Sequence, residues 1–166
     1  MKGFSFYDEA ISDYAWTVSP DVASIQQYLQ LLAVCHTVVP EGEKENVNYQ
    51  AESPDEEALV IAAKELGYKC VKRNLNSLFV EERRPDGRTI ERKYEILHVL
   101  EFTSARKRQS VIYRTPEGEV ILGCKGADNV IYERLAEHTG PPGRLCPGRP
   151  ENPVHKLQKA QQGGLR

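Results

Sequence analysis

Between residues 68 and 125 the sequence consists of strand-like segments separated by short turns, and this pattern limits the possible folds most strongly. Pro85-Asp86-Gly87 and Thr115-Pro116-Glu117-Gly118 supply the residues that tight turns favour. The segments that these and other breaks separate are 68–72, 78–82, 90–102, 109–114 and 119–125. Turns this short join antiparallel neighbours, so the sequence predicts an antiparallel sheet.

The longest segment, 90–102, is predicted to be a central strand. Tyr94, Ile96, His98 and Leu100 fall on one face, while Leu97 and Val99 fall on the other. Because both faces are largely apolar near residue 97, we expect both to be covered.

Helices are predicted before and after these strands in the sequence. Ser19-Pro20-Asp21 is typical of a helix start, and the spacing of apolar residues predicts a helix over about 20–36. Ser53-Pro54-Asp55-Glu56 is a capping box that begins a second helix, which Gly67 ends. The polar residues 40–50 predict a loop, and 128–137 a final helix. Helices combined with hairpins indicate an α+β or mixed α/β fold.

Composition divides the chain near residue 139. Every Tyr, Phe and Trp lies in 1–139, whereas 140–166 holds five of the ten prolines and five of the twelve glycines. We therefore expect one folded domain over 1–139 and a Pro/Gly-rich, flexible tail over 140–166. The formal net charge of -2 argues against general binding of nucleic acid. The longest apolar run has six residues, against about 20 for a membrane span, so no transmembrane segment is expected.

Three segments could carry chemistry, and each has a structural alternative. Arg106-Lys107-Arg108 follows Phe102, and this combination suits the binding of a phosphate and a stacked base. The alternative is that the three cations form a solvated loop and Phe102 lies in the core. Lys125-Gly126-Ala127-Asp128 could admit an anion at a helix start, or form a plain turn that Asp128 caps. Glu56 could accept a hydrogen bond from an adenine amino group, or simply complete its capping box.

These segments, in this order, resemble the nucleotide-binding domain of type IV P-type ATPases, the phospholipid flippases. The resemblance covers about residues 3–137. The motifs that carry it are Gly3-Phe4-Ser5-Phe6-Tyr7-Asp8, Leu32-Ala33-Val34-Cys35-His36-Thr37, Ser53-Pro54-Asp55-Glu56-Glu57-Ala58-Leu59-Val60, Leu100-Glu101-Phe102-Thr103-Ser104-Ala105-Arg106-Lys107-Arg108 and Lys125-Gly126-Ala127-Asp128. Gly164-Leu165-Arg166 resembles the start of a further family segment. The family fold is a twisted antiparallel sheet with flanking helices.

The resemblance also implies ATP-binding residues. Phe102 matches the aromatic residue that stacks on adenine, Lys125 the lysine at the pocket floor, and Glu56 the acidic residue at the adenine edge. Lys107 matches a lysine near the nucleotide. Ser104 and Gly126 occupy further pocket positions, and Gln109 stands where the family usually has methionine.

The implied function is to position ATP for phosphoryl transfer to an aspartate in a separate domain. The Asp-Lys-Thr-Gly motif that carries this aspartate is absent from the sequence, so we expect no catalysis by this chain alone. The implied partners are ATP, the other ATPase domains on the cytosolic face of a membrane, and an accessory transmembrane subunit, with Mg²⁺ bound outside this chain. The alternative is a truncated, non-catalytic product that acts as an interaction module through Arg106-Lys107-Arg108.

Overall fold

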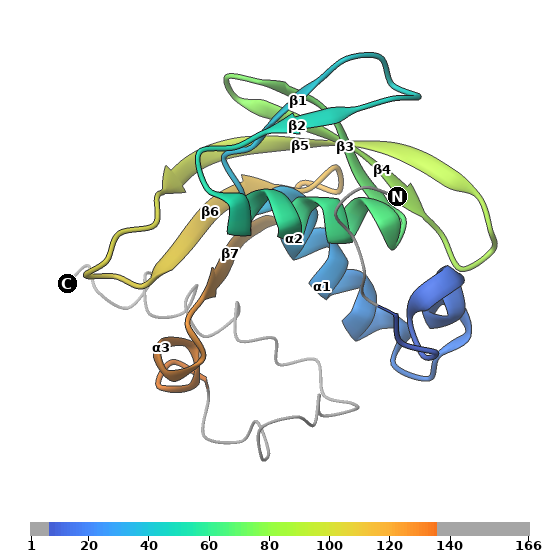
Figure 1. The fold of residues 1–166 in the computed structure, drawn as a ribbon, viewed down its shortest axis with the longest axis horizontal. Helices are drawn as coiled ribbons and strands as arrows, with labels where there is room; N and C mark the ends of the chain where they lie inside the picture. Colours follow the sequence, from blue (N-terminus) through green and yellow to red (C-terminus); the bar gives the residue numbers. More distant parts are fainter. Residues whose placement is uncertain (1–6, 136–166) are drawn as a thin grey trace.

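A computed structural model describes residues 7–135 and confirms the α+β class (Figure 1). Five antiparallel strands form the main sheet in the order β3-β4-β5-β6-β7, so each strand pairs with its neighbour in sequence. They are β3 Tyr68–Asn74, β4 Ser77–Arg83, β5 Thr89–Leu100, β6 Arg108–Arg114 and β7 Val120–Gly126. Gly87 and Gly118 lie in the two predicted turns, with φ of +83° and +90°.

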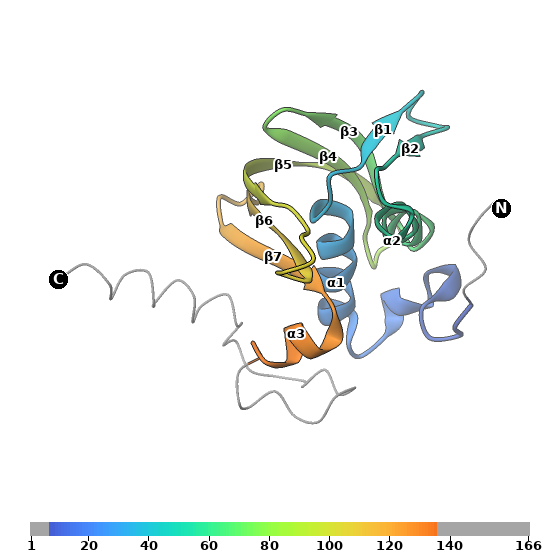
Figure 2. The ribbon, with the colours of Figure 1, turned by 60° about the vertical axis from the view of Figure 1, so that its left-hand side comes forward.

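Two helices, α1 (Val22–Val34) and α2 (Pro54–Glu65), lie on the same side of this sheet (Figures 1 and 2). Helix α1 contacts α2, β3, β4 and β7, and it lies close enough to β7 that a Cβ on Gly123 would come 2.8 Å from Leu31. Both helices begin near their predicted starts, and Gly67 ends α2 with a φ of +100°. No described helix has the length and apolar character needed to cross a membrane.

The core lies between these helices and the sheet. Trp16, Leu29, Val60, Tyr68 and Tyr94 are among its fully buried side chains. Trp16 comes from a 3-10 helix, η1 (Ser12–Val18), that the sequence analysis did not predict, and its indole nitrogen donates to the carbonyl of Leu66 at 3.0 Å. This bond ties the start of the described chain to the end of α2.

Strand β5 is central, as predicted, but the helices cover only one of its faces. Leu97 is 40% exposed, so the expectation that both faces are covered is wrong. The register between β5 and β6 also shifts between Ile96 and His98, which marks a bulge. Because of this shift, His98 and Leu100 do not share the buried face of Tyr94 and Ile96, contrary to the alternation read from sequence.

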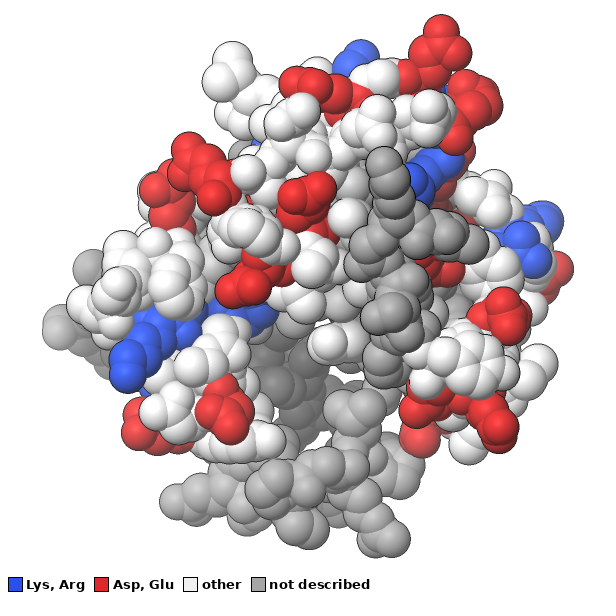
Figure 3. Space-filling view, in the orientation of Figure 1, with Lys and Arg blue, Asp and Glu red and all other residues white. Residues whose placement is uncertain are grey.

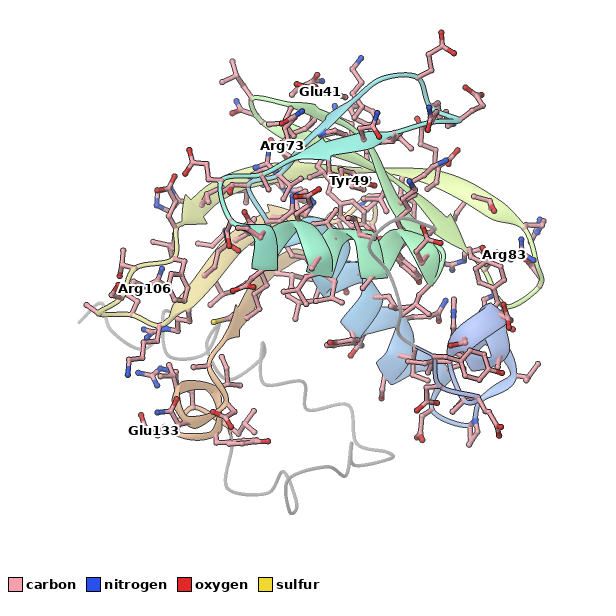
Figure 4. The ribbon with its side chains drawn as sticks, in the orientation of Figure 1. Glu41, Tyr49, Arg73, Arg83, Arg106 and Glu133 are labelled. Atoms are coloured by element: carbon pink, nitrogen blue, oxygen red, sulfur yellow. The ribbon has the colours of Figure 1, made fainter. Side chains whose placement is uncertain are left out.

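The predicted loop at 40–50 is instead a small antiparallel hairpin of β1 (Val39–Glu41) and β2 (Asn48–Gln50). Tyr49 is its buried anchor: its hydroxyl donates to the carbonyl of Cys70 at 3.0 Å, and Lys64 of α2 lies over its ring (Figure 4). The final helix, α3, is Asp128–Tyr132, so it ends before 133–135 of the predicted 128–137, and 136–137 lie outside the described residues. The predicted tail, 140–166, and Gly164-Leu165-Arg166 lie outside the described residues.

A carboxylate is buried within the sheet. Glu82 of β4 is only 2% exposed, and its carboxylate accepts a hydrogen bond from the hydroxyl of Tyr94 on β5. Burial raises the pKa of Glu82 above its usual range, despite this bond and the nearby guanidinium groups of Arg92 and Arg84. This polar cluster lies outside the cavity described next.

Candidate functional site

A cavity of about 1240 Å³ lies where α1, α2 and the ends of β6 and β7 meet. Four of the six residues predicted for the ATP site line it, namely Glu56, Phe102, Lys125 and Gly126. Further lining residues include Tyr28, Leu31, Leu32, Thr37, Leu59, Gln109, Cys124 and Ile131. Residues that lie far apart in the sequence therefore share one hollow with both apolar and polar walls.

Glu56 lies on the first turn of α2 and is 9% exposed. Its carboxylate accepts two hydrogen bonds from Thr37, one from the backbone N–H at 2.9 Å and one from the hydroxyl at 2.7 Å. Burial alone would raise the pKa of Glu56, but the bonds from Thr37 and Gln109 and the charge of Lys125 together lower it. Glu56 is therefore held as a buried carboxylate anion.

The predicted capping box is right for Ser53 and wrong for Glu56. Ser53 does cap α2, since its hydroxyl accepts from the backbone N–H of Glu56 at 3.4 Å. The Glu56 carboxylate, however, is directed to Thr37 instead of completing the box. A helix cap accordingly does not account for this carboxylate.

Lys125, near the end of β7, supplies the cation of the cavity. Its side chain is 15% exposed, and its Nζ lies 3.9 Å from Oε1 of Glu56. This separation exceeds hydrogen-bond length, and the buried Nζ has no hydrogen-bond partner within the described chain. Burial lowers the pKa of Lys125, although the nearby carboxylate opposes the shift. A buried ammonium without an acceptor is costly unless something else supplies one.

Phe102 lies in the loop that joins β5 to β6 and is 60% exposed. The alternative that placed Phe102 in the core is therefore wrong. Arg106 shapes this loop: its guanidinium donates to the carbonyls of Leu100 and Glu101, both at 2.9 Å, and to the hydroxyl of Ser110 at 3.0 Å (Figure 4). The aromatic ring is thus available at the cavity wall on a braced loop.

Gly126 is required by close packing of the chain itself. A Cβ at this position would lie 2.5 Å from both the carbonyl oxygen of Lys107 and the Cβ of Arg108. Lys107 adopts a φ of +51°, and its carbonyl accepts from Ala127 at 3.0 Å. Ser104 and Lys107 are both exposed and do not line the cavity, so the structure does not bring them together with the other four predicted residues.

The basic cluster Arg106-Lys107-Arg108 is only partly directed to solvent. Arg106 braces the loop, and Arg108 donates to the carbonyl of Arg106 at 3.0 Å. Figure 3 shows Lys and Arg atoms gathered near the β5–β6 loop, with acidic side chains above and below them. Because its guanidinium groups have partners within the loop, this cluster does not favour the interaction-module alternative.

Neither reading of Lys125-Gly126-Ala127-Asp128 as a helix start holds as predicted, because Asp128 is not the cap. Ala127, not Asp128, is the N-cap of α3, and the Asp128 carboxylate accepts from the backbone N–H of Asn129 at 2.6 Å. The first turn of this short helix therefore already carries a carboxylate acceptor, and it offers no separate anion site.

Two functional contacts were not identified from sequence. Thr37 is the last residue of the family motif at 32–37, and the only signal of its role was a polar residue between the buried His36 and Val38. Gln109 is 6% exposed, lines the cavity and hydrogen-bonds Glu56, so it adds a polar group where the family usually has methionine.

The chemistry available here is recognition of a flat, partly polar ligand. Phe102 offers a face for stacking, Lys125 an ammonium donor and Glu56 a carboxylate acceptor. Across residues 7–135 there is no group of three or more His, Cys, Asp or Glu side chains that could hold a metal ion. Cys35 is buried and burial raises its thiol pKa to about 12, so it is protonated at neutral pH and a poor nucleophile.

Comparison with known proteins bears on this cavity directly. The chain matches the sequence model of the P-type ATPase cytoplasmic domain N over residues 24–141. Phospholipid-transporting ATPase 10 of Arabidopsis thaliana is 48% identical over 169 residues, covering 100% of this chain and 14% of that protein. The probable phospholipid-transporting ATPases 7 and 11 of the same plant are 46% and 48% identical, each over 83% of this chain.

The matches to these two proteins cover 11% and 12% of their lengths, so this chain corresponds to a small part of each relative. The match to the family model contains every residue that contributes to the cavity. The chain therefore belongs to the family of P-type ATPase cytoplasmic N domains, with relatives among the phospholipid-transporting ATPases.

Proposed function

We propose that this chain binds ATP and positions it for phosphoryl transfer to an aspartate in a separate domain of a phospholipid-transporting ATPase. The family match and the names of the relatives support the general role. The observation that carries the proposal is the buried Nζ of Lys125, which has no hydrogen-bond partner in the described chain and lies in the same cavity as the exposed ring of Phe102. A purine would supply both a face for the ring and an acceptor for the ammonium.

In this proposal each residue has a separate role. Phe102 stacks on adenine, which contributes about 1–3 kcal/mol. Lys125 donates to the base, and Glu56 accepts from its amino group. Gly126 allows the close packing that places Lys125. Ser104 and Lys107 lie outside the cavity lining, so they would contact only parts of the nucleotide that extend beyond it.

The proposal leaves phosphoryl transfer to other parts of the protein. Mg²⁺ would be held by residues outside this chain, together with the triphosphate, and would supply charge neutralisation there. The partners of this chain would be ATP, the phosphorylation, actuator and membrane domains, and through them an accessory transmembrane subunit. The chain would then lie on the cytosolic side of a membrane, as a domain over about residues 1–139.

The test is a titration of the purified chain with ATP, followed by NMR. We expect chemical shift changes near Phe102 and Lys125 at millimolar nucleotide. Phe102→Ala should weaken ATP binding about fivefold or more, since stacking on a ring contributes about 1–3 kcal/mol. Tyr7→Ala is the matched control, because Tyr7 is 69% exposed and does not line the cavity.

Two results would count against ATP binding at this site. The first is an absence of shift changes near the cavity at millimolar ATP. The second is equal weakening by Phe102→Ala and Arg108→Ala, which would favour binding through charge at the basic cluster instead.

A further inference from the structure

Thr37 lies three residues beyond the end of α1, and its backbone N–H and its hydroxyl both donate to one carboxylate. Its backbone N–H donates to Oε1 of Glu56, and its hydroxyl donates to Oε2. Two donors from one residue fix both the position and the plane of the carboxylate. Since Ser53 already caps α2, this pair of bonds is not needed to begin the helix.

We propose that Thr37 is a positioning residue that holds the Glu56 carboxylate away from a direct ion pair with Lys125. This inference rests on the proposed function, because its consequence is that the Lys125 ammonium stays available to a ligand. The separation of 3.9 Å between Nζ and Oε1 supports it, since direct ammonium–carboxylate hydrogen bonds are about 2.7–2.9 Å long. Elsewhere in the chain, Lys69 and Glu81 do form such a pair, at 2.7 Å.

The charges around Glu56 make this restraint necessary. Lys125 approaches from β7, and Arg73 on β3 also acts on the carboxylate. The groups on the α1 side are neutral at pH 7: burial lowers the pKa of His36 to about 3 and raises that of Cys35 to about 12. Gln109 of β6 adds a neutral donor. Without the Thr37 hydroxyl, Oε2 would lose that donor, and the attraction of these cations on the carboxylate would be less restrained.

A carboxylate held only by the Thr37 backbone N–H could therefore turn toward Lys125 and close the pair. The ammonium would then gain an acceptor within the protein, and a ligand would have to break that bond before using it. The loss of one hydrogen bond to a charged group changes an equilibrium about tenfold or more, so the effect on ligand affinity should be measurable.

The experiment compares Thr37→Val with Thr37→Ser in the full chain. Valine keeps the shape and the backbone N–H bond but removes the hydroxyl, and serine restores the hydroxyl without the methyl group. We expect Thr37→Val to weaken ATP binding about tenfold and Thr37→Ser to bind within about twofold of the wild type. Unfolding in urea confirms that both variants remain folded.

A second measurement separates positioning from simple packing. The pKa of Lys125 is followed by NMR of its side-chain ammonium in the absence of ATP. We expect this pKa to rise in Thr37→Val, because a direct ion pair favours the charged lysine, and to stay at the wild-type value in Thr37→Ser.

Unchanged ATP affinity and an unchanged Lys125 pKa in Thr37→Val would overturn the role of Thr37 but leave the proposed function standing. Equal weakening by valine and serine would also overturn it, because the methyl group and not the hydroxyl would then matter. A wild-type chain that does not bind ATP would instead overturn the proposed function. In that case the Lys125 pKa would still decide whether Thr37 restrains the carboxylate.

Discussion

Replacing Lys125 with methionine should stabilise the fold while removing ATP binding. The Lys125 side chain is 15% exposed, and its Nζ has no hydrogen-bond acceptor among residues 7–135. Methionine has a similar length, is unbranched and carries no charge, so it can occupy the same space without the cost of burying an ammonium. The same substitution removes the donor that we assign to the purine.

Two opposing effects set the size of the change. Moving an ammonium out of water costs several kcal/mol even after the protein relaxes. Attraction to Glu56 at 3.9 Å returns about 4 kcal/mol at an effective dielectric constant of about 20. The lowered pKa of Lys125 shows that burial outweighs attraction. Because Thr37 still satisfies Glu56 in the variant, we expect a gain of about 1 kcal/mol in the free energy of unfolding.

Urea denaturation at pH 7 measures this change, with Lys93→Met as the matched control on the exposed part of β5. The wild type should also gain stability as the pH rises from the lowered pKa of Lys125 toward 10.5, where the unfolded chain keeps a proton that the folded chain has released. Lys125→Met should lack this gain. If Lys125→Met instead lowers the free energy of unfolding at pH 7 by about 1 kcal/mol or more, the reasoning is refuted. Such a loss would show that Glu56 depends on the ammonium.

Three further outcomes follow from the structure. Gly126→Ala should lower the free energy of unfolding by about 1–3 kcal/mol in urea, because its Cβ would meet Arg108 and the Lys107 carbonyl at 2.5 Å. The free energy of unfolding of the wild type should fall as the pH rises from 4.5 to the raised pKa of Glu82, because the unfolded chain loses a proton that the folded chain keeps. Glu82→Gln should remove this fall. The chain alone should neither hydrolyse ATP nor form an acid-stable phosphoprotein, as phosphate release and acid gels would show.

Each of these has a control or a contrary result. Gly118→Ala is the comparison for Gly126→Ala, since a Cβ there meets nothing within 4 Å and only its φ of +90° is unfavourable. Equal stability of wild type and Gly126→Ala would mean that β6 and β7 separate easily. A pH slope that persists in Glu82→Gln would assign it to another group. Any phosphoprotein would reveal a nucleophile that the sequence does not show.

Local signals predicted most of the fold. Turn residues, alternation and the Ser53 cap act through a few neighbouring residues, and the corresponding elements are present. The β1–β2 hairpin was missed because its stability depends on distant packing, in which Tyr49 reaches Cys70 and lies under Lys64. The bulge at 96–98 was missed because its cause lies in the pairing with β6, which alternation in one strand cannot reveal.

The candidate site was predicted by resemblance more than by residue chemistry. Composition alone could not separate Glu56 as a cap from Glu56 as an acceptor, because the distinction depends on Thr37, which lies in another element. Phe102 was equally ambiguous until the bonds made by Arg106 placed its loop at the surface. The nucleotide-binding roles of all six residues stay predictions, and two of them, Ser104 and Lys107, lie outside the cavity lining.

The carboxylate of the cavity comes from α2, Thr37 from the segment between α1 and β1, and the ammonium from β7, the last strand of the sheet. During synthesis the ribosome therefore releases the carboxylate well before the lysine that faces it. A nascent chain that stops before β7 lacks Lys125, and with it the cation of the proposed purine pocket. Capture of nucleotide would then report that the last strand has docked, and ligand present at that moment would favour the completed sheet over any earlier state.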